Sequence, residues 1–304
     1  MALTSSGQLS LQDIANEQGV TLSNVSLRSM SNTAGFAIPD AISEFYGYSS
    51  YSNDYFYRND GVNDYVSGTW SILTNLSTGG GWTIRFWVRQ NQTTASSDQL
   101  WDFNANTTIN SGNTANRVFL QYNSSTNRFI ARIRSNSVNF DKQVALHDNL
   151  TATGVSSSGW TTSNRGNVNG DGFCMVTVTY DSSESTAANA IKIYWNASEL
   201  TTSATTASGT RTAMTAARLT LGASAHNITG GNSQVDIDEW AFYSGVLTST
   251  QVSALYNSGV IVDAKNINST NLETSIRFGA SNALDIYGPL FTNTTVSGGS
   301  TIAY

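Results

Sequence analysis

The sequence predicts an all-β protein, an antiparallel sandwich of two sheets of jelly-roll type, preceded by a short helical N-terminal segment. Two observations support this. From about residue 55 onward, apolar and polar residues alternate in about ten short segments, which is the period of a strand with one buried face. Ser, Thr and Asn make up 110 of the 304 residues, a composition that favours strands joined by polar turns over long helices.

Residues 1–50 differ from the rest and form the predicted N-terminal segment. Ser10, with Asp13 three positions later, predicts a capping box for a short helix that ends near Gly19. Asp40 is expected to cap a second short helix. Because two helices of fewer than about ten residues bury no core alone, we expect this segment to dock on the next domain, on a copy of itself or on another protein.

Residues 51–304 form the predicted sandwich domain. Within residues 82–88, apolar residues alternate with the others, and all but Trp87 fit a strand with one buried face. Ser249 is expected to cap a single late helix that ends at Gly259, and a polar stretch closes the chain. The predicted strands are 82–88, 118–122 with 129–134 as a hairpin, 173–180 with 190–195, 219–221, 235–243 and 275–278.

Composition excludes several classes of function. The net charge of −6 argues against nucleic-acid binding, because the chain has no surplus of cations to displace counterions from phosphates. No run of about 18 apolar residues predicts a membrane span, and the first residues lack the features of a secretory signal. The single cysteine, Cys174, lies in an apolar run and is expected to be buried. We therefore expect synthesis in a cytoplasm, without disulfides or membrane insertion.

Four parts of the chain follow one another in the order of a known family. They are Asp60–Val66, Trp82–Val88, Val176–Asp181 with Ile191–Asn196, and Ile237–Tyr243 with Leu247–Tyr256. Together they resemble the laminin-G-like, concanavalin-A-type jelly-roll domains, over residues from about 55 to 280. Where the central strand of that family usually begins with Trp and His, this chain has Gly172–Met175, which weakens any function assigned to those positions.

The N-terminal segment has a resemblance of its own. Ser6–Ile14, Ser26–Ser29 and Ile42–Gly47 resemble the opening segments of tail-fibre and appendage proteins of tailed bacteriophages. This implies a non-enzymatic structural virion protein, assembled in the host cytoplasm, with residues 1–50 bound to other virion proteins. Two places remain open: a tail fibre or appendage that recognises host glycan, or a decoration protein or fibre of the head. We also expect a homo-oligomer.

A polysaccharide-cleaving enzyme is the interpretation from another class. Its acids would be Asp236, Asp238 and Glu239. Adjacent Asp238 and Glu239 point to opposite faces of a regular strand, so only Asp236 and Asp238 share a face unless a bulge intervenes. The only histidines, His147 and His226, have no Gly-x-Ser-x-Gly serine elbow to serve. We therefore predict no catalytic residue.

The family resemblance suggests a different role for one of these acids. An acidic residue at the position of Asp238 often helps to hold a structural calcium together with the opening segment, here Asp60 and Asp64. Calcium takes six to eight oxygen ligands, which carboxylates and turn carbonyls supply. The alternative is that these aspartates cap turns or pair with arginine. No other cofactor is expected.

A glycan platform is predicted around Trp87. If its strand neighbours pack inward, Trp87 stands on the other face with Arg85 and Arg89 beside it. Exposed aromatic rings stack on sugars, and arginine donates paired hydrogen bonds to hydroxyls or carboxylates. Arg132 and Arg134 of the later hairpin also share a face and could take part. The alternative is that Trp87 is covered by the helix, by the N-terminal segment or by a neighbouring subunit.

Overall fold

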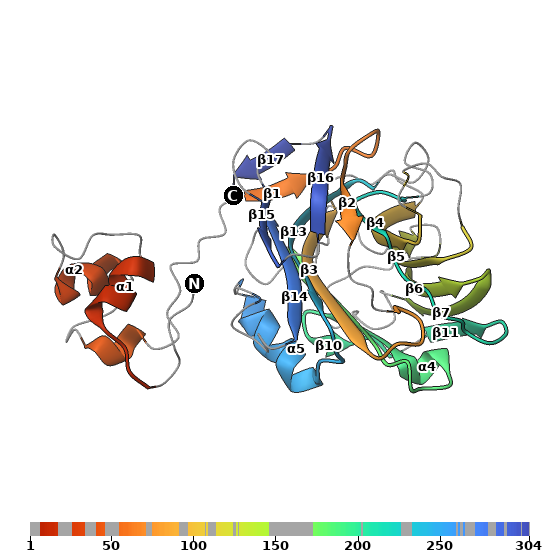
Figure 1. Cartoon of the computed structure of the whole chain (residues 1–304), viewed down its shortest axis with the longest axis horizontal. Helices are drawn as coiled ribbons and strands as arrows, with labels where there is room; N and C mark the ends of the chain where they lie inside the picture. The colour runs from red at the N-terminus through yellow and green to blue at the C-terminus, as the bar shows by residue number, and fades with distance from the viewer. Residues whose placement is uncertain are drawn as a thin grey trace. The chain divides into compact units, whose positions relative to one another are not determined.

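A computed structural model of the whole chain divides it into two compact units, one of residues 1–53 with 265–269 and one of residues 54–264 with 270–304 (Figure 1). The structure describes residues 7–17, 26–33, 41–45, 55–70, 75–90, 97–106, 108, 114–123, 126, 128–145, 173–201, 203–225, 233–259, 261, 264, 271–278, 284–288, 291–298 and 300–303. His147, His226 and Gly172, the first residue of the departure from the family pattern, lie outside these residues.

The first unit contains three short helical elements. They are the α-helices α1 (Leu11–Glu17) and α2 (Leu27–Thr33) and the 3-10 helix η2 (Ile42–Phe45). The predicted capping box of α1 is confirmed: the N–H of Ser10 donates to the Asp13 carboxylate at 2.8 Å, and the N–H of Asp13 donates to Ser10 Oγ at 3.2 Å. The hydroxyl of Ser10 lowers the pKa of that carboxyl.

This unit has a small hydrophobic core. Ile14 and Ala15 of α1, Met30 of α2 and Phe45 of η2 form one buried cluster. The expectation of a segment without a core of its own is therefore wrong, because α2, which the sequence did not predict, adds a third element and supplies Met30.

The second unit is the predicted antiparallel sandwich. Its first sheet, sheet A, has the strand order β10-β9-β8-β3-β13-β1-β17, and β14 pairs with β13 and β15 outside this path. Every ladder within it is antiparallel. The strands are β1 (Tyr55–Arg58), β3 (Trp82–Gln90), β8 (Cys174–Tyr180), β9 (Ile191–Trp195), β10 (Ser198–Glu199), β13 (Val235–Tyr243), β14 (Leu272–Phe278), β15 (Leu284–Tyr287) and β17 (Ser300–Ala303).

The second sheet, sheet B, has the strand order β11-β7-β6-β5-β4-β12-β2-β16 and is also antiparallel. The predicted hairpin is confirmed as β5 and β6, which pair from Asn123 with Arg128 onward. The strands are β2 (Tyr65–Trp70), β4 (Ser97–Asn104), β5 (Arg117–Asn123), β6 (Arg128–Ser135), β7 (Val138–Ala145), β11 (Ser203–Ala207), β12 (Arg218–Leu221) and β16 (Phe291–Ser297).

The C-terminal stretch is not the expected polar tail. It forms β16, which pairs with β2 in sheet B, and β17, which pairs with β1 in sheet A. Figure 1 shows these blue strands beside the orange opening strands of the sandwich. Each sheet therefore joins a strand from the start of the domain to one from its end.

The core between the sheets is aromatic. Trp70 and Phe103 of sheet B meet Trp240 and Phe242 of sheet A, with ring centroids 5.2–6.0 Å apart between the sheets. All four rings belong to the single hydrophobic cluster described for this unit. Edge-to-face packing of such rings adds to the free energy gained by burying them. Cys174 is buried in the same cluster, as predicted.

Few helices accompany the sheets in the described residues. They are α4 (Ala187–Ala190), α5 (Ser249–Tyr256) and the 3-10 turn η5 (Asn257–Gly259). Thr248, one residue before the predicted Ser249, caps α5 and forms a capping box with Gln251. Among the described segments, no helix combines the length and the hydropathy that a bilayer crossing requires.

We expect Trp240→Ala to lower the free energy of unfolding by about 3–5 kcal/mol, because a fully buried indole at the centre of the aromatic cluster would leave a cavity. Chemical denaturation measures the change. Val62→Ala is the control, since Val62 is 68% exposed, and it should change stability by less than about 0.5 kcal/mol. Equal effects of the two substitutions would contradict the central place of Trp240.

Candidate functional site

Trp87 does not form an exposed platform. It is 2% exposed, and its ring stacks on that of Tyr256 in α5, with centroids 6.0 Å apart and an angle of 26° between the ring planes. The predicted exposure of Trp87 is therefore wrong. The helix covers this part of sheet A, which is one of the alternatives that the sequence left open.

The two arginines beside Trp87 hold the fold together. Arg85 is fully buried; its guanidinium donates to the Glu239 carbonyl at 3.0 Å and lies 3.7 Å from the Glu239 carboxylate. Arg89 and Arg58 bind the two oxygens of buried Asp236, with distances between 2.5 and 3.0 Å. These side chains are occupied by partners inside the protein, so no glycan platform forms here.

A β-bulge changes the direction of the acidic residues on β13. The register with β3 shifts between Asp238 and Ala241, and Glu239 has a positive φ of 51°. Because Ile237 and Trp240 both point into the core, Asp238 and Glu239 both face the outer side of sheet A. The opposite orientation expected for a regular strand is wrong. Each acid is at most 1% exposed, so they do not line an open cleft.

The three predicted calcium ligands do not come together. Asp60 and Asp64 lie in one turn, where the N–H of Asp60 donates to the Asp64 carboxylate at 2.8 Å. Asp238 lies elsewhere: Arg58 is opposite Asp236, which places Asp238 about four residues, or roughly 13 Å, from Asp60 along the ladder. Among the described residues, no three His, Cys, Asp or Glu side chains are grouped to hold a metal. Asp60 and Asp64 therefore cap a turn, which is one of the alternatives that the sequence left open.

The outer face of sheet B carries the strongest candidate site. A row of side chains crosses it from strand to strand, each directly opposite the next in the register. The row consists of Ser67 on β2, Thr220 on β12, Asp102 on β4, Phe119 on β5, Arg132 on β6 and Asp141 on β7. Their strand neighbours in sequence point into the core, so alternation sends this row to the outer side of the sheet. Five of the six residues are nevertheless at most 4% exposed, and only Arg132 remains partly accessible.

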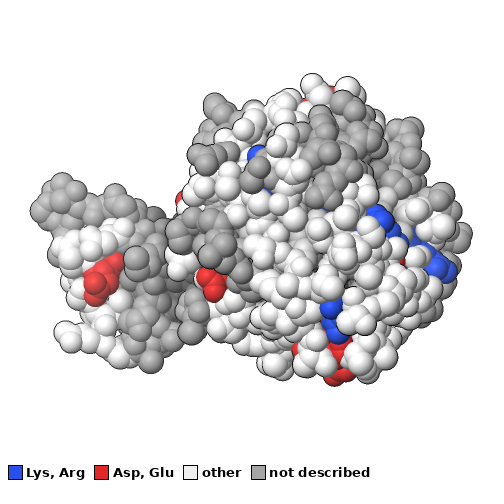
Figure 2. Space-filling view, turned by 45° about the vertical axis from the view of Figure 1, so that its right-hand side comes forward, with Lys and Arg blue, Asp and Glu red and all other residues white. Residues whose placement is uncertain are grey.

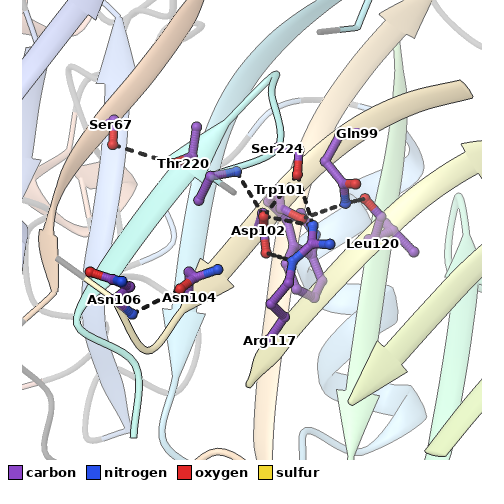
Figure 3. A network of polar contacts seen from close by, with 11 residues as sticks. Ser67, Gln99, Trp101, Asp102, Asn104, Asn106, Arg117, Leu120, Thr220 and Ser224 are labelled. Carbon is purple, nitrogen blue, oxygen red and sulfur yellow. Dashed lines mark hydrogen bonds and ion pairs between the residues drawn. The ribbon is translucent and has the colours of Figure 1, made fainter. Parts of the chain in front are cut away.

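Asp102 is the centre of a polar network in this row (Figure 3). Its carboxylate accepts hydrogen bonds from the Arg117 guanidinium at 2.7 and 3.2 Å, from the N–H of Ala225 at 2.8 Å and from Ser224 Oγ at 3.3 Å. Burial raises the pKa of Asp102, while the Arg117 charge acts in the opposite direction. Arg117 is itself buried, so its position is fixed.

Phe119 lies between two cations. The guanidinium carbon of Arg117 is 4.6 Å from the centre of its ring, and that of Arg132 is 5.6 Å away. Arg132 in turn donates to Asp141 at 2.8 Å, and its side chain keeps 27% of its surface exposed. Arg132 thus lies beside an aromatic ring and a carboxylate on the sheet opposite Trp87, and its role in glycan binding stays a prediction.

Positive charge exceeds negative charge on this face. Arg128 and Arg134 lie on the same side of β6 as Arg132, are half-buried and have no ion pair among the described residues. Arg218 donates to Ser67 Oγ at 2.9 Å from the neighbouring β12. Counting these, the described side chains of the face hold five arginines and two aspartates. Figure 2 shows Lys and Arg atoms gathered on the side where β5–β7 lie.

Part of this site is predictable from the sequence. Arg132 and Arg134 alternate with apolar residues in a hairpin arm, which predicts that they share an outer face. The same alternation places Asp102 between Trp101 and Phe103, and Phe119 between two core residues, but the sequence did not show that the two strands pair. The missing information was which strands pair and in which register.

Comparison with known proteins assigns no family. No family model and no curated protein sequence matches the chain. Solved structures are similar at low identity. A carbohydrate-binding candidate from Bacteroides ovatus has 12% identity and a TM-score of 0.47, and the match covers 84% of this chain and 61% of that one.

Binding domains of botulinum neurotoxins are also similar. A structure of type C, described as dependent on two ganglioside molecules for cell entry, has 14% identity and a TM-score of 0.38, covering 60% of this chain and 36% of that one. The type DC domain in complex with SialylT has 14% identity and a TM-score of 0.39, covering 64% and 39%. The chain thus spans well under half of these toxin chains, and its function has to be argued from its own residues.

We expect Asp102→Asn to lower the free energy of unfolding by about 3 kcal/mol, because it leaves the Arg117 charge buried without a counter-charge. Thermal or urea unfolding measures this. Asp285→Asn breaks an ion pair with Arg277 in which the aspartate is 61% exposed, and should cost less than about 1 kcal/mol. A loss at Asp102 no larger than that at Asp285 would contradict a buried network.

Proposed function

We propose that this chain is a non-enzymatic virion protein of a tailed phage, a tail fibre or appendage. Its sandwich binds an acidic glycan on the host surface, and residues 1–53 attach it to the particle. The proposal of glycan binding rests chiefly on one observation, the arginine-rich outer face of sheet B. The proposal of a virion protein attached through its N-terminal unit rests on the separateness of that unit and on its sequence resemblance to phage appendage proteins.

The chemistry of the outer face of sheet B favours an anionic sugar. The bonded arginines Arg117 and Arg132 are held by Asp102 and Asp141, so they lose little further freedom when a ligand binds. Arg134 is different: its side chain is half-buried and has no ion pair in the described part of the chain. A guanidinium of this kind suits paired hydrogen bonds to a carboxylate or sulfate, and the arginine excess provides attraction in a chain of net charge −6.

The N-terminal unit supports attachment. It is a compact unit with its own core, and Leu11 on its first helix is 36% exposed. A small unit of this kind can bind a second protein without disturbing the sandwich. Virion localisation and assembly with other virion proteins are parts of this proposal, and the homo-oligomer stays a prediction.

We expect Arg134→Gln to weaken binding to an acidic bacterial polysaccharide about tenfold, because a charge-assisted hydrogen bond contributes about 1.5–3 kcal/mol. Binding is measured on an array of acidic and neutral polysaccharides at two salt concentrations. Arg277→Gln removes the same charge from β14 in sheet A and should leave the affinity unchanged. Identical affinities of the two variants, or preference for neutral polysaccharides, would reject this site.

We expect deletion of residues 1–53 to leave a folded sandwich that is absent from purified particles. The reason is that the core of the second unit is complete without the first. Incorporation is measured by immunoblotting particles from cells that express the tagged variant. Arg134→Gln in the full chain serves as the control and should be incorporated. Truncated protein present in particles at the normal copy number would contradict attachment through this unit.

A further inference from the structure

A polar pocket lies in the sandwich, on sheet A rather than sheet B. It has a volume of about 300 Å³, at the lower end of the range for small-molecule sites. Its lining residues come from β8, β9 and β10, from α4 and the loop that leads into it, and from the loop that begins α5.

The floor of the pocket is set by strand register. Glu199 on β10 is opposite Tyr194 on β9, and Lys192 on β9 is opposite Thr179 on β8, so these four side chains share the outer face of sheet A. Tyr194 is 3% exposed. Burial raises the pKa of Tyr194, so its hydroxyl stays protonated at neutral pH.

One wall is fixed by the loop before α4. The side chain of Asp181 accepts hydrogen bonds from Ser183, from its N–H at 2.9 Å and its hydroxyl at 2.6 Å. The Arg211 guanidinium donates to the carbonyl of Glu184 at 2.7 Å, which ties this loop to a distant part of the chain. Asn189 follows on α4, where its exposed side chain reaches the pocket.

The opposite wall is fixed by the loop before α5. The hydroxyl of Thr83 donates to the Gly245 carbonyl at 2.8 Å and accepts from the N–H of Leu247 at 2.9 Å. Val246 lies so close to Gly81 that a Cβ there would come within 2.3 Å of its side chain. The glycine thus permits the close approach, and the wall is in place before any ligand arrives.

The lining combines acceptors and donors. Asp181, Glu184 and Glu199 supply carboxylates, and in the described residues neither Asp181 nor Glu184 takes part in an ion pair. Lys192, 3.8 Å from Glu199, and the amide of Asn189 supply donors. Sugar hydroxyls both donate and accept, so a mixed lining suits them, whereas three carboxylates with one ammonium repel an anion. Val246, which is 42% exposed, offers a small apolar contact for the C–H groups of a ring.

We propose that this pocket binds one neutral monosaccharide unit, at a site separate from the acidic-glycan site on sheet B. The two sites lie on different sheets and differ in charge, so one domain can engage two chemically distinct sugars. The inference does not depend on the arginines of sheet B, and either site can fail without the other.

The test uses the full chain and four soluble probes: the methyl glycosides of glucose, galactose and N-acetylglucosamine, and methyl glucuronide as the acidic probe. Binding is followed by NMR shifts of the backbone amides of residues 181–194 and 245–249. We expect saturable shifts at these amides with at least one neutral probe, and at least tenfold weaker binding of the glucuronide.

Two variants locate the site. Asn189→Ala should raise the Kd of the neutral probe about fivefold, which is the effect of losing one neutral hydrogen bond, and Tyr194→Phe removes the hydroxyl while keeping the buried ring. Asn63→Ala, at an exposed turn, is the matched control and should change nothing, and neither should Arg134→Gln. No saturable shift with any neutral probe, glucuronide binding of equal strength, or shifts confined to sheet B would overturn the proposal.

Discussion

The contact between the two sheets through Trp70, Phe103, Trp240 and Phe242 is the interaction on which the rest of the structure depends. Two rings come from each sheet, so the cluster fixes how the sheets face one another. Only when the apolar side of each strand is committed to this core does alternation send the charged residues outward. Both candidate sugar sites are therefore consequences of the packing between the sheets.

The two outer faces are used differently. On sheet A, α5 covers Trp87, and the arginines of β3 form ion pairs with Asp236 and Glu239. Most of β3 is therefore buried on both sides. A pocket lies near β9 and β10. On sheet B, ion pairs within the face hold two arginines in place, while Arg128 and Arg134 have no ion pair among the residues that the structure describes.

Local periodicity was enough to predict the fold but not the site. Alternation in residues 82–88 correctly separated core from outer residues, yet it carried no information about a helix about 160 residues later that covers Trp87. The bulge at Glu239 reversed an orientation deduced from strict alternation. The strand β16, Phe291–Ser297, was missed because its side chains are mostly Ser, Thr and Asn, which also form turns. Each failure involves tertiary context that a single window cannot contain.

The pairing of β1 with β17 and of β2 with β16 sets a constraint on how the protein is made. More than two hundred residues separate these partners, so the ribosome exposes the first strands long before their neighbours exist. Until then, an edge of each sheet stays open to another nascent chain. Completion of the sandwich therefore waits until β16 and β17 have been synthesised, and its rate is governed by the closure of a very large loop.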